Sequence, residues 1–173
     1  MDIELTTERL NIRKFVAEDA RFILDLLGQP SFIRFIGDKG VRTMNDANNY
    51  IISGPVKSYN THGFGLYLVE CKSLKTPIGM CGVLKRDSLP DPDLGFAFLP
   101  QYWGKGHAFE AASAVLQEAR DKFKLIRVLA ITNPDNDASI KLLVKLGFKF
   151  ERVMKLSSDS DEVKLFSLMF EPD

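Results

Sequence analysis

Leu-Pro-Gln-Tyr-Trp-Gly-Lys-Gly-His-Ala, residues 99–108, joins a short apolar run to a long amphipathic helix pattern. Gln101, Gly104 and Gly106 give the spacing Gln-x-x-Gly-x-Gly where that helix is predicted to begin. A turn of this kind exposes successive backbone N–H groups at the positive end of a helix, and these groups bind phosphate oxygens. Glycine is needed because a Cβ would hold the backbone away from the ligand and disfavour a positive φ. The stretch therefore predicts a phosphate-binding turn.

Two better-known phosphate loops do not fit this stretch. A Walker loop continues Gly-Lys with Ser or Thr, whereas Gly106 follows Gly104-Lys105 here. A Rossmann turn needs Gly or Ala at the position that Phe109 occupies. For these residues taken alone, an ordinary strand-to-helix turn remains an equal alternative.

A second segment, residues 132–148, favours the phosphate-binding turn over an ordinary strand-to-helix turn. It reads Thr-Asn-Pro-Asp-Asn-Asp-Ala-Ser-Ile-Lys-Leu-Leu-Val-Lys-Leu-Gly-Phe. Asn136 and Ser139 lie three residues apart at a predicted helix start, and Lys145-Leu-Gly-Phe148 ends that helix and begins a strand. With the glycine turn before it, this segment resembles the GNAT superfamily of acyl-CoA N-acyltransferases.

Shorter motifs resemble the branch of that superfamily that acetylates the N-termini of ribosomal proteins, the Rim-type enzymes. They are Leu5-Thr-Thr-Glu-Arg-Leu10, then Arg13, Glu18-Asp-Ala20, Ile78-Gly79 and Asp93-Leu-Gly-Phe96. The resemblance runs from about residue 5 to about residue 170, and the two central motifs are more specific than the N-terminal one.

Composition is that of an ordinary globular protein, and residues 1–173 are expected to form a single domain. Apolar residues make up 45% of the chain, and 23 Lys and Arg balance 23 Asp and Glu, which disfavours nucleic acid as a direct partner. No apolar stretch is long enough to span a membrane, and the N-terminus lacks a signal-peptide pattern. Cys71 and Cys81 lie in apolar runs and are expected to be buried, reduced thiols of a cytoplasmic protein.

Apolar periodicity predicts interleaved strands and helices. Strands are expected over 10–15, 64–71, 78–85, 94–99, 127–131, 148–154 and 163–170, and helices over 18–27, 44–52, 108–123 and 136–146. The turn 73–77 predicts a hairpin, so the sheet cannot be purely parallel. We therefore expect an α+β, single-domain, GNAT-like fold with a central mixed, mostly antiparallel sheet flanked by helices.

The resemblance implies acetyl-CoA as co-substrate and places the following residues beside it: Phe96, Ala97, Phe98, Gln101, Trp103, Gly104, Lys105, Gly106, His107, Ala108, Asn136 and Ser139. The turn would hold the phosphates and the strand before it the pantetheine arm. Trp103 is expected to anchor the core under the turn rather than to recognise a ligand. Asn136 could equally be a plain N-cap, and Ser139 a first-turn helix residue. No metal is expected, because His62 and His107 are not in a metal-ligand spacing.

Asp93 is the candidate general base, because it matches the acidic residue that many family members carry on this strand. The alternative is a solvated aspartate in the turn-rich stretch Pro90–Asp93. The expected oxyanion donor is a backbone N–H within residues 94–98. At the position of the family's usual tyrosine acid stands Leu143, which has no proton to donate, and the resemblance then proposes Ser139 as the donor. A thiolate leaves tolerably well without a strong acid, since a thiol has a pKa of only about 8.5.

The expected activity is transfer of an acetyl group from acetyl-CoA to a primary amine, first of all the N-terminal α-amine of a protein such as a ribosomal protein. A basic protein N-terminus is the expected partner, because 87–93 and 159–162 are acidic loops that the family fold would place near the acceptor entrance. The alternative for each loop is a solvated turn with no role in binding. Two alternatives stay open: a small amine such as a polyamine or an aminoglycoside as acceptor, and an acyl-CoA-binding module without turnover.

Overall fold

One eight-stranded sheet organises the chain. In the computed structural model, which describes residues 2–171, the strands are ordered β1-β2-β3-β4-β5-β6-β8-β7. Every neighbouring pair is antiparallel except β5 and β6. The bounds are Ile3–Thr6, Leu10–Arg13, Leu66–Cys71, Thr76–Leu84, Asp93–Phe98, Arg127–Thr132, Lys149–Lys155 and Glu162–Met169 for β1 to β8. The predicted mixed, mostly antiparallel sheet is therefore confirmed.

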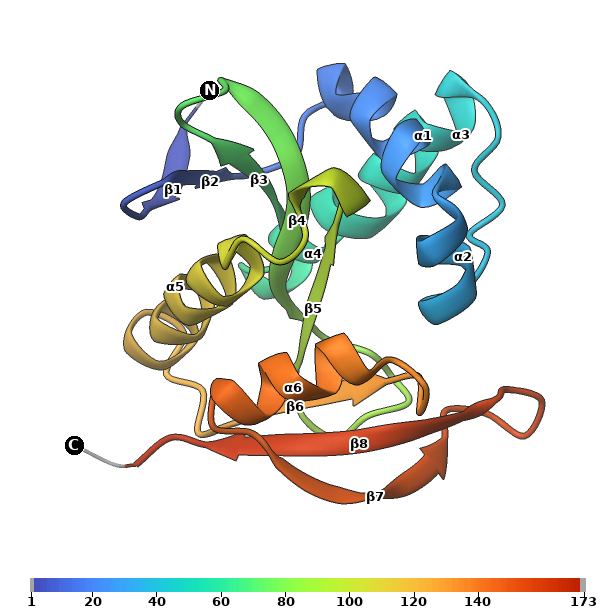
Figure 1. The fold of residues 1–173 in the computed structure, drawn as a ribbon, viewed down its shortest axis with the longest axis vertical. Helices are drawn as coiled ribbons and strands as arrows, with labels where there is room; N and C mark the ends of the chain where they lie inside the picture. Colours follow the sequence, from blue (N-terminus) through green and yellow to red (C-terminus); the bar gives the residue numbers. More distant parts are fainter. Residues whose placement is uncertain (1, 172–173) are drawn as a thin grey trace.

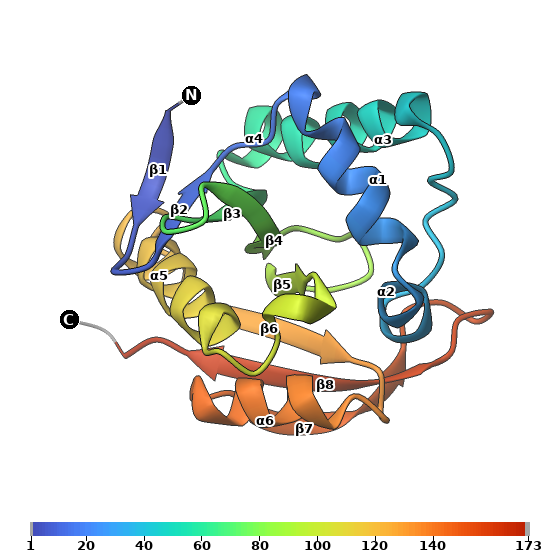
Figure 2. The same cartoon turned by 45° about the horizontal axis from the view of Figure 1, so that its top comes forward.

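Helices cover both faces of this sheet (Figures 1 and 2). The α-helices are α1 (Ala20–Gly28), α2 (Pro30–Phe35), α3 (Met44–Ile51), α4 (Lys57–His62), α5 (His107–Asp121) and α6 (Asp137–Lys145). Short 3-10 turns span Ala17–Asp19 and Pro100–Tyr102, and a π-helical turn spans Ile52–Val56. In the part of the chain that the structure describes, no helix is long and apolar enough to cross a membrane.

Two hydrophobic cores lie on opposite faces of the sheet. Because side chains alternate along a strand, Cys81, Val83 and Leu94 point to one face and pack with the alanines of α5. Met80 and Ala97 point to the other face and pack against α1 and α3. Cys71 and Cys81 are buried and unpaired, as expected.

The sequence missed three elements for identifiable reasons. β1 pairs with β2 through a tight turn, but its four residues are too few to show a period. α2 begins directly at Pro30, which the sequence pattern indicates as a helix stop although proline is also favoured in a first turn. α4 follows α3 through a π-turn that contains Pro55, and this interruption hides the helical pattern.

The parallel strands β5 and β6 are paired at one position only. Asp93 lies opposite Leu129, and the Leu129 N–H donates to the Pro92 carbonyl at 2.9 Å. The Leu99 N–H donates to the opposite side, to Ile78 of β4, at 3.0 Å. Because N–H directions alternate along a strand, the N–H groups of even-numbered residues 94, 96 and 98 point away from β4, toward the side of β6. The Leu94 N–H belongs to the pairing at Asp93 and Leu129. Beyond that point the two strands diverge and leave the N–H groups of residues 96 and 98 facing a gap.

A close backbone approach stabilises the centre of the sheet and gives a prediction. A Cβ on Gly82 of β4 would lie 2.0 Å from the Gly65 carbonyl oxygen and 2.7 Å from the Leu66 Cα. Backbone cannot move aside as a flexible side chain does, so we expect Gly82→Ala to lower the free energy of unfolding by about 3 kcal/mol. Urea denaturation measures the change.

Gly28→Ala is the matched control, because Gly28 ends α1 and an added methyl group there would meet no atom within 4 Å. Its unfolding free energy should stay the same or rise slightly. Equal stability of the two variants would show that β3 and β4 do not approach as described.

Candidate active site

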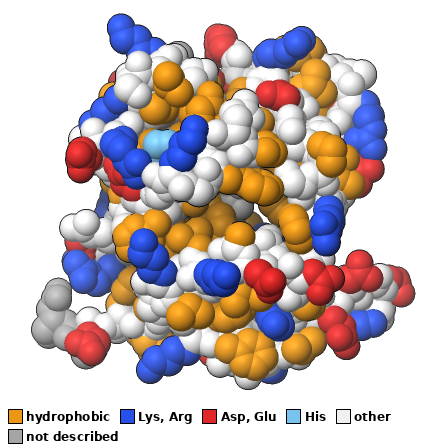
Figure 3. Space-filling view, in the orientation of Figure 1, with side chains coloured by type: hydrophobic (Ala, Val, Ile, Leu, Met, Phe, Trp, Pro, Cys, Tyr) orange, Lys and Arg blue, Asp and Glu red, His pale blue; other side chains and the backbone are white. Residues whose placement is uncertain are grey.

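The gap between β5 and β6 opens into a long cleft of about 890 Å³. One part, the glycine-turn half, is lined by residues 96–98, 102–104, 106–109, 131–133 and 136–139. The other part, the α1–α3 half, is lined by residues of α1, α2, α3, β3 and β4 and by Lys39, Arg86 and Asp93. Figure 3 shows a hollow across this face with hydrophobic side chains inside it and Lys and Arg side chains near its edge. The volume is that of a pocket for a cofactor-sized ligand.

Both glycines of the turn are required by their backbone conformation. Gly104 has φ +69° and Gly106, the N-cap of α5, has φ +81°. These values lie in the left-handed region, which disfavours any side chain. Nothing lies within 4 Å of a Cβ on Gly104, so the backbone there is open to a ligand. The turn is thus built as the sequence predicted, with free amides at the start of a 15-residue helix.

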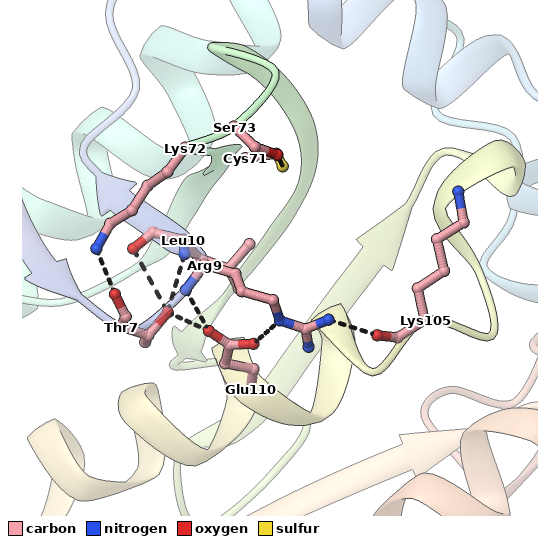
Figure 4. A network of polar contacts seen from close by, with 8 residues as sticks. All are labelled: Thr7, Arg9, Leu10, Cys71, Lys72, Ser73, Lys105 and Glu110. Atoms are coloured by element: carbon pink, nitrogen blue, oxygen red, sulfur yellow. Dashed lines mark hydrogen bonds and ion pairs between the residues drawn. The ribbon is translucent and has the colours of Figure 1, made fainter.

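An ion-pair network ties the N-terminal hairpin to this turn (Figure 4). The Arg9 side chain donates to Glu110 of α5 at 2.6 Å and to the Lys105 carbonyl at 2.8 Å. Glu110 also accepts from the Thr7 hydroxyl at 2.6 Å and the Arg9 backbone N–H at 2.8 Å. Because the Lys105 carbonyl is held from behind, the peptide planes of the turn have a fixed orientation. These contacts join Thr7 and Arg9 of the Thr-Thr-Glu-Arg motif to a glycine turn about 100 residues later along the chain.

Two buried polar atoms of the glycine-turn half have no partner in residues 2–171. They are Nδ1 of His107 and Oγ1 of Thr132, and both residues line the cleft. Buried polar groups are nearly always hydrogen-bonded, so an unpaired atom beside a cleft fits a ligand that supplies the partner. Burial and the nearby Arg9 lower the pKa of His107. Lys145 adds a cation to this half, and its Nζ lies 4.2 Å from the ring centre of Phe109. The half is therefore suited to the phosphates and amides of coenzyme A.

The structure brings most of the residues predicted to bind CoA into this one half. Those that line the cleft are Phe96, Ala97, Phe98, Trp103, Gly104, Gly106, His107, Ala108, Asn136 and Ser139. Gln101 and Lys105 are exposed on the turn but do not line the cleft, and the Lys105 ammonium lies over the Tyr102 ring. Trp103 is not a core anchor: it is 50% exposed, because its indole N–H reaches back to the Phe98 carbonyl at 2.8 Å. The aromatic ring stays at the cleft surface.

The start of α6 combines capping with an open hydroxyl. The Asn136 side chain accepts from the Ser139 N–H at 3.2 Å, so Asn136 is indeed the N-cap. The Ser139 hydroxyl makes no hydrogen bond within residues 2–171 and lines the cleft. Leu143 is fully buried in the core and does not line the cleft. That position of α6 therefore contributes packing and no proton donor.

Asp93 lies where the two halves of the cleft meet. It has no exposed surface, so the alternative of a solvated loop aspartate is wrong. Both carboxylate oxygens accept from Nε of Arg86 at 3.0 Å. Burial raises the pKa of Asp93 above its usual range, and the Arg86 charge opposes that rise. A buried carboxylate with a raised pKa, held by one cation, has the properties of a general base.

Sequence reasoning missed the residues of the α1–α3 half. Arg86 follows the end of β4, Lys39 lies between α2 and α3, and Tyr50 lies on α3. None belongs to a motif, and only folding brings these segments together. The alternation of β4 and β5 was the one available signal, because it places residues 84 and 93 side by side on the same face.

Comparison with known proteins agrees with this geometry. The sequence profile of the acetyltransferase (GNAT) domain matches residues 9–149. The uncharacterized N-acetyltransferase YnaD of Bacillus subtilis is 29% identical over 153 residues, which cover 88% of this chain and 86% of YnaD. The solved structure of RimL, a ribosomal L7/L12 alpha-N-protein acetyltransferase in complex with coenzyme A, has a TM-score of 0.83 at 15% identity and covers 99% of this chain and all of its own. The microcin C7 self-immunity acetyltransferase MccE, solved with acetyl-CoA and AMP, has a TM-score of 0.78 at 18% identity and covers 95% of this chain and 94% of its own.

The glycine turn gives a binding prediction. Gly106→Val places a branched side chain at φ +81° beside the free amides, so we expect the affinity for acetyl-CoA to fall at least about tenfold, or 1.4 kcal/mol. Calorimetry on the folded variant measures Kd.

Gly147→Val is the control for backbone strain. Gly147 also has a positive φ, +96°, but it lies outside the cleft lining, in the turn after α6. This variant should lose stability and keep its Kd for acetyl-CoA. An unchanged Kd in Gly106→Val would place the ligand elsewhere.

Proposed function

We propose that this chain, which belongs to the acetyltransferase (GNAT) family and is an acetyl-CoA-dependent N-acetyltransferase, acetylates the free α-amine at the N-terminus of a protein, such as a ribosomal protein. The observation that carries this proposal is the single carboxylate of the α1–α3 half, Asp93, held by Arg86.

The proton chemistry of this carboxylate favours an α-amine. An amine attacks a thioester only in its neutral form. An α-amine has a pKa of about 8 and a lysine amine about 10.4, so near pH 7 the α-amine is neutral roughly a hundred times more often. Asp93 is one base already engaged with a cation, and Leu143 offers no acid. A site with one base and no strong acid suits an acceptor that is more often neutral near pH 7, which is the α-amine.

Residues of this chain can be assigned to each step of the transfer. Acetyl-CoA supplies the activated acetyl group. The N–H groups of residues 96 and 98 face the gap and would stabilise the negative charge that develops on the acyl oxygen. Asp93 would take the amine proton, directly or through water, and the Ser139 hydroxyl would donate a proton toward the departing sulfur.

Two neighbouring structures support two acceptor classes. RimL is named as an alpha-N-protein acetyltransferase, which supports a protein α-amine and the Rim-type branch. MccE was solved with AMP, and this chain has aromatic side chains and cations in its α1–α3 half. A small molecule with a primary amine is therefore the second candidate. The third alternative, a binding module without turnover, is disfavoured by the buried Asp93 and by the name N-acetyltransferase given to the relatives.

Some of the acidic side chains that the sequence predicts near the acceptor entrance are neutralised by ion pairs, and others are not. Of the loop 87–93, Asp91 pairs with Arg127 at 3.3 Å and Asp93 pairs with Arg86. In the β7–β8 turn, Asp159, Asp161 and Glu162 are exposed and have no ion pair among the described residues. Attraction of a basic protein N-terminus therefore depends on that turn and on Asp87, which is exposed and has no ion pair among the described residues. We place the reaction in the cytoplasm, where two unpaired buried cysteines remain reduced.

The base assignment predicts a large catalytic defect. Asp93→Asn removes the proton acceptor and should lower kcat by about 10²–10⁴ while the Kd for acetyl-CoA stays the same. In the wild type, kcat/KM should fall as the pH decreases through the pKa of Asp93, which burial raises above 3.8, because only the ionised carboxylate accepts a proton. Steady-state rates across pH measure both effects.

Asp91→Asn is the matched control, since Asp91 lies two residues earlier and outside the cleft lining, and its rate should stay near that of the wild type. Ser139→Ala should slow turnover less than Asp93→Asn, because a thiolate leaves with little assistance. Wild-type rates in Asp93→Asn at neutral pH would refute the assignment.

The acceptor is tested by competition. Equal amounts of a peptide with a free basic N-terminus, the same peptide with a blocked N-terminus and an internal lysine, a polyamine and an aminoglycoside are offered with acetyl-CoA. We expect the free α-amine to be labelled first, less strongly as salt rises, and mass spectrometry identifies the product. Preferential labelling of the polyamine or aminoglycoside would overturn the proposal.

A further inference from the structure

The α1–α3 half of the cleft carries more positive than negative charge. Three charged side chains of the described residues line it: Lys39, Arg86 and Asp93. The other charged lining residues, Asp137 and Lys145, belong to α6 in the glycine-turn half. With Asp93 ionised, one positive charge in the α1–α3 half has no counter-charge.

Both cations keep donors that nothing in residues 2–171 uses. Arg86 binds Asp93 through its Nε alone. The two terminal nitrogens of its guanidinium have no hydrogen bond to any described residue. The Lys39 ammonium has neither a hydrogen bond nor an ion pair within the described chain. Although Lys39 is exposed overall, loss of water around its ammonium lowers its pKa, and the Arg86 charge lowers the pKa further. The two cations are thus close enough to repel each other.

The surroundings of these donors are apolar. Phe32 and Phe35 of α2, Tyr50 of α3 and Leu84 of β4 line the same half. Burial also raises the pKa of the Tyr50 phenol. A cation is costly in such surroundings unless an anion faces it, and hydrogen bonds to a charged partner are about twice as strong as neutral ones. The recess is therefore complementary to a carboxylate attached to an apolar body.

We propose that Lys39 and the terminal nitrogens of Arg86 form an anion subsite for the acceptor, which binds a carboxylate close to the amine that is acetylated. The inference rests on the proposed function, because it concerns the same acceptor. In a protein acceptor the carboxylate is an Asp or Glu side chain within the first residues. In a small acceptor it is the molecule's own carboxylate. Asp93, on the other side of Arg86, stays next to the amine.

Matched acceptors test the subsite. Peptides that differ only by Glu, Gln or Lys at the second residue are compared by kcat/KM, alongside a free dipeptide and its C-terminal amide. We expect Glu over Gln by roughly tenfold through KM, since a charge-assisted contact contributes at about this level. In Lys39→Gln this ratio should fall several-fold. In Lys149→Gln, an exposed lysine of β7 outside the cleft, it should stay the same. Discrimination by the dipeptide pair alone would assign the carboxylate to a small acceptor.

A binding measurement keeps the inference separate from the proposed function. The acetylated Glu and Gln peptides are titrated into the wild type and Lys39→Gln by calorimetry, which needs no turnover. Tighter binding of the Glu product, lost in Lys39→Gln, supports the subsite. Equal binding of the two products, together with equal kcat/KM within both the Glu and Gln peptide pair and the dipeptide and amide pair, overturns it. Failure to acetylate any free N-terminus, with acetyl-CoA bound normally, contradicts the proposed function instead.

Discussion

The divergence of β5 from β6 after one paired position, Asp93 with Leu129, opens the cleft and determines where the site residues lie. A parallel pair needs a crossover connection, and here the crossover is the glycine turn followed by α5. The same connection that joins the two strands therefore delivers a helix N-terminus to the open end of the gap. If the strands stayed paired along their whole length, the N–H groups of residues 96 and 98 would form hydrogen bonds within the sheet. The cleft exists because β5 and β6 do not form these hydrogen bonds with each other.

Residues near the N-terminus hold the glycine turn in place at the open end of this gap. Arg9 holds the Lys105 carbonyl and Glu110, so the hairpin β1–β2 fixes the turn from outside the cleft. A buried pair ties β2 to the 3-10 turn before α1: Arg13 and Asp19 share two hydrogen bonds of 2.8 Å and are both more than nine-tenths buried. Breaking such a pair costs about 3–5 kcal/mol, because one charge is left buried alone. The N-terminal motif is thus structural in its contacts, although its effect reaches the ligand site.

The sequence predicted the glycine-turn half far better than the α1–α3 half, and the difference has a physical cause. Binding phosphate through backbone amides requires glycine at a fixed spacing, and capping α6 requires a residue such as Asn136. Both features can therefore be recognised from a short stretch of sequence. Binding an acceptor demands only side chains that converge in space. Arg86, Lys39 and Tyr50 come from three separate segments, and no spacing links them. Trp103 was misplaced because a large aromatic usually packs inside, whereas its indole N–H here bonds a carbonyl at the cleft surface.

We infer that one cleft holds the acetyl donor at the glycine turn and the acceptor in the α1–α3 half. A crystal structure of the protein with coenzyme A would test this inference. We expect phosphates on the amides of residues 104–108 and a pantetheine arm between β5 and β6, ending near Asp93. Coenzyme A bound elsewhere, for example in the groove between α5, α6 and β8 that Phe109, Gln117 and Leu168 line, would contradict it.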